Sequence, residues 1–250
     1  MNYTYISQFR TGFKREENED ALGAFEVENG LLVIVCDGLG GNKGGEIAST
    51  FAVEAIYSSF KKLEMSDYLE RIKITMQEAN CAVLRESLNN THLRGMATTA
   101  EVLFFSDSTA YWGHVGDSRI YLFKNDKLEQ LTKDHTFVQK LLDEGMSTLK
   151  NSETLPDKNV LTRALGGICK LEVDLSKTNF EHDLFLVCTD GVTSTISNNE
   201  IEEILFLKDG EISSELSSLV EERGAPDNFS YVLISKIVSS QLYQKVFEGE

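Results

Sequence analysis

The chain has 250 residues, of which 41% are hydrophobic and 26% are charged, and these proportions are ordinary for a soluble globular protein. Its formal net charge of −16 argues against binding to nucleic acid or to an anionic membrane surface, because both would repel it. No apolar run approaches the roughly 18–20 residues that cross a bilayer. The sequence starts without a secretion signal and its four cysteines form no CxxC pair, so we expect a cytoplasmic protein with reduced thiols and no zinc site.

The first half of the chain predicts one buried strand and two long helices. Residues 31–36 are a short apolar run that ends at an Asp-Gly pair, which is typical of a buried strand. Apolar side chains recur at helical spacing from Glu46 to about Leu63, and again over residues 66–88. The Ser-Asp pair that opens the second of these segments is suited to capping a helix.

The middle of the chain predicts short strands followed by a helix. Residues 98–105, 109–116 and 118–126 are rich in β-branched and aromatic residues and are separated by turn residues, which indicates an antiparallel meander. A helix fits residues 134–144, with Asp134 as its N-cap.

The last third of the chain predicts two strands, at 183–191 and 228–237, with helices at 199–207 and 213–223 between them. Strands and helices do not alternate regularly along the chain. The order therefore favours an α+β protein with antiparallel pairing over a parallel βαβ fold.

A glycine-rich segment follows the strand at 31–36, with five glycines within eight positions from Gly38. A P-loop would place Gly before Lys43 and Ser or Thr after it, and the sequence has neither. The strand also ends in Asp37, whose carboxylate would repel a phosphate. A nucleotide-binding loop is therefore a weak interpretation.

Acidic residues at the ends of predicted strands favour a metal site instead. A second apolar strand ends in Asp190-Gly191, Asp227 opens the last strand, and Asp20 closes an acidic segment near the start of the chain. Each Asp-Gly pair alone is usually a turn, but several such carboxylates together are harder to dismiss. Oxygen ligands without His or Cys partners suit Mg²⁺ or Mn²⁺.

At this point the sequence resembles the metal-dependent serine/threonine protein phosphatases of the type-2C, or PPM, family in their compact bacterial form. The matching segments occur in the family's order and span residues 11 to about 235: TGFKREENED, VCDGLGG with GGEIAS, ATTAEV, GHVGDSRIYL, LTKDHT, LTRALG, LVCTDGVT and DNFSYVLI. The resemblance implies two antiparallel sheets packed as a β-sandwich, flanked by helix pairs on both outer faces (α-β-β-α). With no repeat or linker in the sequence, we expect one domain over residues 1–250 with its core at about 5–238.

The resemblance also implies roles for individual residues. Asp37 would bridge two metal ions, the carbonyl of Gly38 would contact one of them, and Asp190 and Asp227 would complete the ligands of the other. Arg15 would grip the substrate phosphate.

Three further acidic residues are implicated by the same motifs. Glu19 and Asp20 would lie beside the metals, as ligands or as neighbours of ligands. Asp117, in the GDSR motif, would help to hold a weaker third metal ion.

The activity implied is hydrolysis of phosphoserine and phosphothreonine in proteins, by a water or hydroxide that bridges two Mn²⁺ or Mg²⁺ ions. A cluster of aspartates alone would repel a phosphate dianion, so the cations are needed first. The guanidinium of Arg15 suits the phosphate because it can bind two oxygens at once. We expect Arg15, Asp37 and Asp190 to carry catalysis, without a nucleophilic Ser or Cys.

The expected partners are phosphoproteins, including a serine/threonine kinase or its targets, and the expected state is a monomer. Two alternatives stay open: a weak or inactive interaction module with the same fold, and a phosphohydrolase of small molecules or nucleotides. The intact set of Asp37, Asp190, Asp227 and Arg15 argues against a pure interaction module.

The sequence departs from the family pattern at Leu39 and Asn42, where relatives carry histidines, and at Ser194, where an Asp is common. None of these is a principal metal ligand, so activity is still expected, with the leaving group protonated by water or by another group. We interpret residues 145–160 as a flap that influences substrate choice, and His114 as a structural strand residue.

Overall fold

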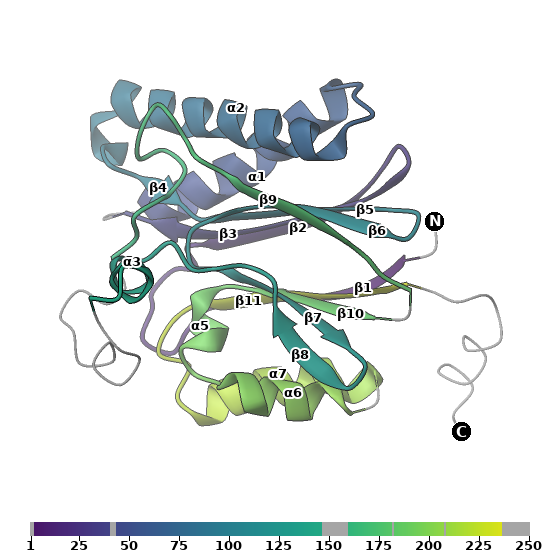
Figure 1. Cartoon of the computed structure of the whole chain (residues 1–250). Coiled ribbons are helices and arrows are strands. Elements are labelled where there is room, and N and C mark those ends of the chain that lie inside the picture. Colours follow the sequence, from purple (N-terminus) through teal and green to yellow (C-terminus); the bar gives the residue numbers. More distant parts are fainter. Residues whose placement is uncertain (1–2, 41–43, 147–159, 182, 208, 237–250) are drawn as a thin grey trace.

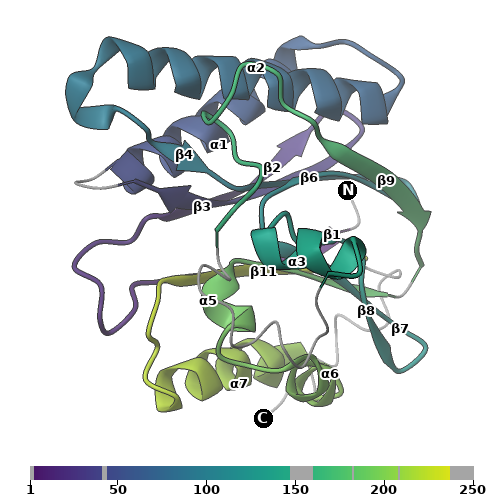
Figure 2. The same ribbon diagram turned by 60° about the vertical axis from the view of Figure 1, so that its left-hand side comes forward.

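The computed structural model describes residues 3–40, 44–146, 160–181, 183–207 and 209–236. These residues form four layers, in the order helices, sheet, sheet, helices (Figures 1 and 2). All of the strand pairs within the two sheets are antiparallel. The α-β-β-α sandwich expected for the chain is therefore confirmed.

The first sheet lies under the helices α1 and α2 (Figure 1). Its strand order is β2-β3-β5-β6-β9, with the short strand β4 paired to β3. The elements of these two layers are β2 (Asp20–Val27), β3 (Gly30–Leu39), β4 (Ala97–Thr98), β5 (Ala100–Ser106), β6 (Thr109–Val115), β9 (Asp174–Asn179), α1 (Gly44–Lys62) and α2 (Tyr68–Asn89).

The second sheet has the strand order β1-β11-β10-β7-β8 and is covered by α6 and α7 (Figure 1). Its elements are β1 (Tyr3–Arg10), β7 (Arg119–Lys124), β8 (Lys127–Gln130), β10 (Leu184–Cys188), β11 (Phe229–Lys236), α6 (Asn198–Leu205) and α7 (Asp209–Glu222). The shorter helices η1 (Thr91–Leu93), α3 (Phe137–Asp143) and α5 (Asp190–Thr193) lie in the connections.

The layers explain why the central strands are apolar along their whole length. On β3, Leu32 and Ile34 face the core under α1 and α2, whereas Val33 and Val35 face the core between the two sheets. A strand that is buried on both faces has no reason to alternate apolar with polar residues. Aromatic rings fill the layer between the sheets, where Phe105, Phe180 and Phe185 pack edge to face with ring centroids 5.1–5.5 Å apart.

The helices and strands predicted from the sequence are present, with one error of arrangement. Residues 98–126 do not form one meander, because β5 and β6 belong to the first sheet and β7 to the second. The turn 116–118 carries the chain from one sheet to the other, and Gly116 adopts a φ of 121° there. Strands β1, β2, β8 and β9 were not predicted. Most of the expected flap at 145–160 lies outside the described residues, as does Asn42.

In the described part of the chain, no helix is both long enough and apolar enough to cross a membrane.

Asn80 ties α2 to the loop that leads from α3 toward β9. Its Oδ1 accepts a hydrogen bond from the backbone N–H of Gly166 (2.8 Å), and its Nδ2 donates to the carbonyl of Ile168 (2.9 Å). The adjoining residue Leu165 pairs with Thr98, next to the end of β3. One fully buried amide side chain therefore holds this loop against the first sheet.

Replacing Asn80 with alanine should lower the free energy of unfolding by about 1–3 kcal/mol, because the buried amide of Gly166 loses its acceptor. Urea denaturation followed by circular dichroism measures the change. Asn89→Ala, at the exposed end of the same helix, is the matched control and should change stability by no more than about 0.5 kcal/mol. Equal losses in the two variants would show that the contacts of Asn80 contribute nothing specific.

Candidate functional site

The fold brings the predicted aspartates together at the ends of strands from both sheets. Asp37 lies near the end of β3, and Asp20 is its direct partner across the β2–β3 pair. Asp190 opens α5 just after β10, and Asp227 lies two residues before β11. Asp117 sits in the turn that crosses between the sheets. Residues that are far apart in the sequence thus meet where the two layers adjoin.

The aspartates lie close enough for their charges to act on one another. Burial raises the pKa of Asp37 well above its ordinary value, and the charges of Asp20, Asp190 and Asp117 raise it further. Burial, together with neighbouring aspartates, also raises the pKa values of Asp20 and Asp117 to about 7. Burial, together with the charge of Asp227, raises the pKa of Asp190 as well.

The glycines of the motifs are required by close backbone approach. A Cβ on Gly38 would lie 2.1 Å from the carbonyl oxygen of Gly45, and one on Gly191 would lie 1.9 Å from that of Asn228. A Cβ on Gly12 would lie 2.3 Å from the carbonyl oxygen of Asp227. Real Cβ atoms do not approach so closely, so each of these positions excludes every residue except glycine.

Hydroxyl groups fix the strand ends that carry the aspartates. The backbone N–H of Asp37 donates to Oγ1 of Thr99 (2.8 Å), and the hydroxyl of Thr98 donates to the carbonyl of Asp37 (2.9 Å). In the same way, the hydroxyl of Thr189 donates to the buried carboxylate of Asp20 (3.0 Å), next to Asp190. Thr98 and Thr99 therefore hold the end of β3 at Asp37.

Asn228 has a role that the sequence reasoning missed. Its side chain accepts a hydrogen bond from the N–H of Gly12 (3.1 Å) and donates one to the carbonyl of Glu17 (3.1 Å). These bonds hold the loop that carries Arg15 against Asp227. The position of Asn228 directly after Asp227 in the DNFS motif was the available signal.

Arg15 lies at the rim of this acidic cluster. Its guanidinium pairs with Asp227 (2.6 Å) and, at 3.6 Å, with Glu19, and 41% of its side chain is exposed. Burial raises the pKa of Glu19 despite that pair. The backbone carbonyl of Glu19 accepts from the N–H of Gly38 (3.0 Å), which holds the two predicted site segments together.

The donor set fits divalent cations, although the side chains now interact with one another. Among the described residues, no three His, Cys, Asp or Glu side chains already surround one point as metal ligands. Asp227, for example, is paired with Arg15 (2.6 Å). Carboxylates whose pKa values are raised by burial and by one another's charges are nevertheless the groups that Mg²⁺ or Mn²⁺ would stabilise.

The comparison with known families agrees with the motifs. Residues 14–223 match the family described as Protein phosphatase 2C. The serine/threonine phosphatase stp of Listeria monocytogenes serotype 4b (strain F2365) is 35% identical over 243 residues, which cover 92% of this chain and 95% of that protein.

Solved structures give the same result. The crystal structure of the Mycobacterium tuberculosis serine/threonine phosphatase PstP/Ppp has a TM-score of 0.87 and 30% identity, covering 95% of this chain and 100% of that one. The catalytic domain of serine threonine protein phosphatase PstP in complex with 2 manganese ions has a TM-score of 0.84 and 30% identity, covering 95% and 99%.

The raised pKa values predict that cation binding releases protons. At pH 7 a carboxyl with a pKa of about 7 is half-protonated, and a cation displaces that proton. Asp117→Asn should therefore release about half a proton fewer than the wild type on binding Mn²⁺ at pH 7, and the difference should vanish near pH 8.5. Calorimetric titrations in buffers of different ionisation enthalpy measure the protons.

Asp126→Asn, in the exposed β7–β8 turn, is the control and should match the wild type at both pH values. The same proton release from the wild type and Asp117→Asn at pH 7 would contradict the raised pKa of Asp117.

Proposed function

This chain belongs to the protein phosphatase 2C family, and from that premise we propose that its buried aspartates hold divalent ions for the hydrolysis of phosphoserine and phosphothreonine in proteins. It is a metal-dependent serine/threonine protein phosphatase. The observation that supports the site most strongly is the gathering of carboxylates that raise one another's pKa values beside an exposed guanidinium.

Asp37, Asp190 and Asp227, with the carbonyl of Gly38, would hold two Mn²⁺ or Mg²⁺ ions, the number of manganese ions in the PstP catalytic domain. Asp117 would contribute to a weaker third ion. When bound, the ions lower the pKa of a bridging water toward 7 and neutralise the charge of the phosphate.

The remaining residues of the site support these ligands. Asp20 is buried and accepts a hydrogen bond from Thr189, so it fixes the backbone that leads into Asp190. Glu19 would stay beside the metals, where it orients Arg15. The Arg15 guanidinium is exposed on one side and can direct a fork of N–H donors at two phosphate oxygens.

The proposal extends to the substrates, the oligomeric state, the location and the extent of the domain. The phosphoprotein substrates would include a serine/threonine kinase or its targets, and the phosphatase would act as a monomer in the cytoplasm. The phosphatase unit would be a single domain over residues 1–250, with a core at about 5–238.

The first test is turnover of p-nitrophenyl phosphate and of a phosphothreonine peptide with Mn²⁺, with and without EDTA, beside Asp190→Asn. EDTA should abolish turnover, and Asp190→Asn should lower it by about 100-fold or more because a metal ligand is lost. Asp126→Asn is the control and should keep wild-type turnover. A folded wild type that binds Mn²⁺ without turnover would favour an interaction module, and preferred hydrolysis of nucleotides would favour a small-molecule enzyme.

Arg15→Ala separates phosphate binding from metal binding. It should lower kcat/KM for the peptide by about 10- to 100-fold, the value of one charge-assisted hydrogen bond, and Arg15→Lys should restore part of the loss. Mn²⁺ affinity, measured by calorimetry, should not fall, because the substitution removes a cation that competes for Asp227. Lys14→Ala, at the exposed neighbouring position, is the control; a large loss of Mn²⁺ affinity in Arg15→Ala would contradict the assigned role.

A further inference from the structure

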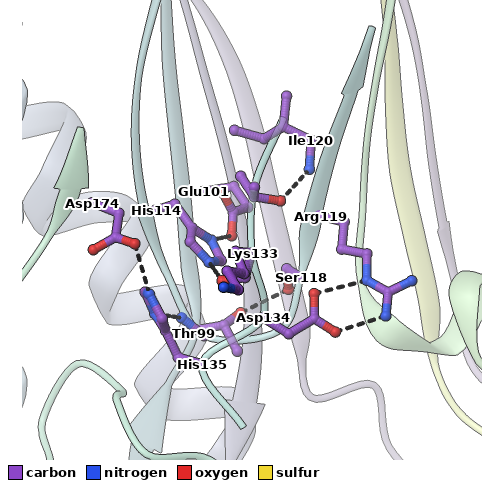
Figure 3. A network of polar contacts seen from close by, with 12 residues as sticks. Thr99, Glu101, His114, Ser118, Arg119, Ile120, Lys133, Asp134, His135 and Asp174 are labelled. Atoms are coloured by element: carbon purple, nitrogen blue, oxygen red, sulfur yellow. Dashed lines mark hydrogen bonds and ion pairs between the residues drawn. The ribbon is translucent and has the colours of Figure 1, made fainter. Parts of the chain in front are cut away.

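The crossing turn that carries Asp117 is held from one side by His135 (Figure 3). The backbone N–H of His135 donates to the carbonyl of Gly116 (2.7 Å). In return, the backbone N–H of Gly116 donates to Nδ1 of the His135 ring (3.1 Å). One residue thus satisfies both backbone groups of the glycine that directly precedes Asp117.

These bonds assign the form of the His135 ring. Nδ1 must accept, so the proton is on Nε2, which donates to Oδ2 of Asp174 (3.1 Å). Arg163 lies 3.1 Å from the same Nε2, but its hydrogen bond goes to the other oxygen of Asp174 (2.7 Å). Burial and the charge of His114 lower the pKa of His135 to about 4, which agrees with a neutral ring.

The face of the His135 ring rests on a buried ion pair. The His114 ring lies 4.4 Å from it between centroids and donates from Nδ1 to Glu101 (2.5 Å) and from Nε2 to the carbonyl of Lys133 (2.9 Å). Since both nitrogens of His114 donate, that ring is an imidazolium. Burial alone would lower the pKa of His114, but the Glu101 carboxylate raises it to about 9.

The segment before His135 is anchored separately. Asp134 accepts two hydrogen bonds from the guanidinium of Arg119, at 2.9 and 2.6 Å (Figure 3). The N-cap of α3 is Thr136, whose Oγ1 accepts from the N–H of Gln139 (3.1 Å), so the predicted capping role of Asp134 is wrong. Both sequence neighbours of His135, Asp134 and Thr136, are therefore held by hydrogen bonds, which restricts the backbone position of His135.

Gly116 has little freedom of its own. Its φ of 121° is rare for any other residue, and an added Cβ would lie 2.5 Å from Cβ of Thr99. On the far side of Asp117, the hydroxyls of Ser118 and Thr99 are 2.9 Å apart. The turn is thus held on both sides of Asp117, by His135 at Gly116 and by Thr99 at Ser118.

We propose that His135 is a positioning residue for Asp117, acting through the two backbone hydrogen bonds of Gly116. The inference rests on the proposed function, in which Asp117 holds the weaker third ion. Loss of the Nδ1 acceptor frees the Gly116 amide and lets the turn rotate, which weakens the ion held by Asp117. The two ions held through Asp37, Asp190 and Asp227 lie beyond this contact and keep their affinity.

Two substitutions separate the two edges of the ring. In His135→Asn, the side-chain oxygen can replace Nδ1 as the acceptor for the N–H of Gly116. In His135→Gln, the longer side chain reaches toward Asp174, as Nε2 does, and leaves the N–H of Gly116 without an acceptor. In metal-free protein, hydrogen exchange at the Gly116 amide, followed by NMR, should be about tenfold faster in His135→Gln and near the wild-type rate in His135→Asn. This readout needs neither metal nor substrate.

Calorimetric Mn²⁺ titration provides the second readout. His135→Gln should weaken the third, weaker binding event by about 10-fold and leave the two tighter events unchanged, with His135→Asn again near the wild type. The exposed His92→Ala variant is the control and should change neither readout. In an Asp117→Asn background, His135→Gln should have no further effect on Mn²⁺ binding, because that effect passes through Asp117, whereas Gly116 exchange should still be faster.

The proposal is overturned if His135→Gln folds, as judged by circular dichroism, and leaves both Gly116 exchange and the weak Mn²⁺ event unchanged. Equal effects of His135→Gln on Mn²⁺ binding in the presence and absence of Asp117 would also overturn it, since they would show that the effect does not pass through Asp117. Failure of the proposed function would look different: the wild type itself would then show no tight Mn²⁺ binding that depends on Asp190.

Discussion

Mutual repulsion among buried carboxylates is the constraint on which the rest of this structure depends. Bringing Asp20, Asp37, Asp117 and Asp190 within range of one another raises the free energy of the folded chain, because each charge disfavours ionisation of the next. The surrounding backbone is fixed by hydroxyl and amide side chains, such as Thr99 on Asp37 and Asn228 on Gly12. Divalent cations would relieve the repulsion, so metal binding and stability are two aspects of the same interaction.

The sandwich is the means by which the chain assembles this cluster. Each sheet alone carries only part of the acidic set, with Asp37 on β3 of one sheet and Asp190 beside β10 of the other. The crossing turn at 116–118 adds a residue that belongs to neither sheet. A site made in this way is fixed by the packing of whole layers and does not depend on any single loop. The histidine and threonine contacts then set the finer orientation of the turn.

The strongly patterned parts of this fold could be predicted from sequence, and the weakly patterned parts could not. Two apolar strands ending in Asp-Gly gave both the central strands and the principal candidate ligands. Strand β2 escaped notice because Gly23 and several alanine and acidic residues dilute its pattern, and its register is set only by pairing with β3. The division of residues 98–126 between two sheets depends on non-local pairing. The prediction of Asp134 as the N-cap of α3 failed for the same reason. Its carboxylate instead accepts hydrogen bonds from Arg119, which lies fifteen residues earlier in the sequence.

The aromatic layer between the sheets has a consequence for the acidic cluster at the strand ends. Phe105, Phe180 and Phe185 fill the space that separates the two sheets, and the aspartates are attached to the ends of strands from both. The volume of these rings therefore contributes to the spacing of the two sheets whose strand ends carry the aspartates. An aromatic layer that binds no ion thus bears on the geometry of the acidic cluster, since the two sheets that it separates carry different members of that cluster.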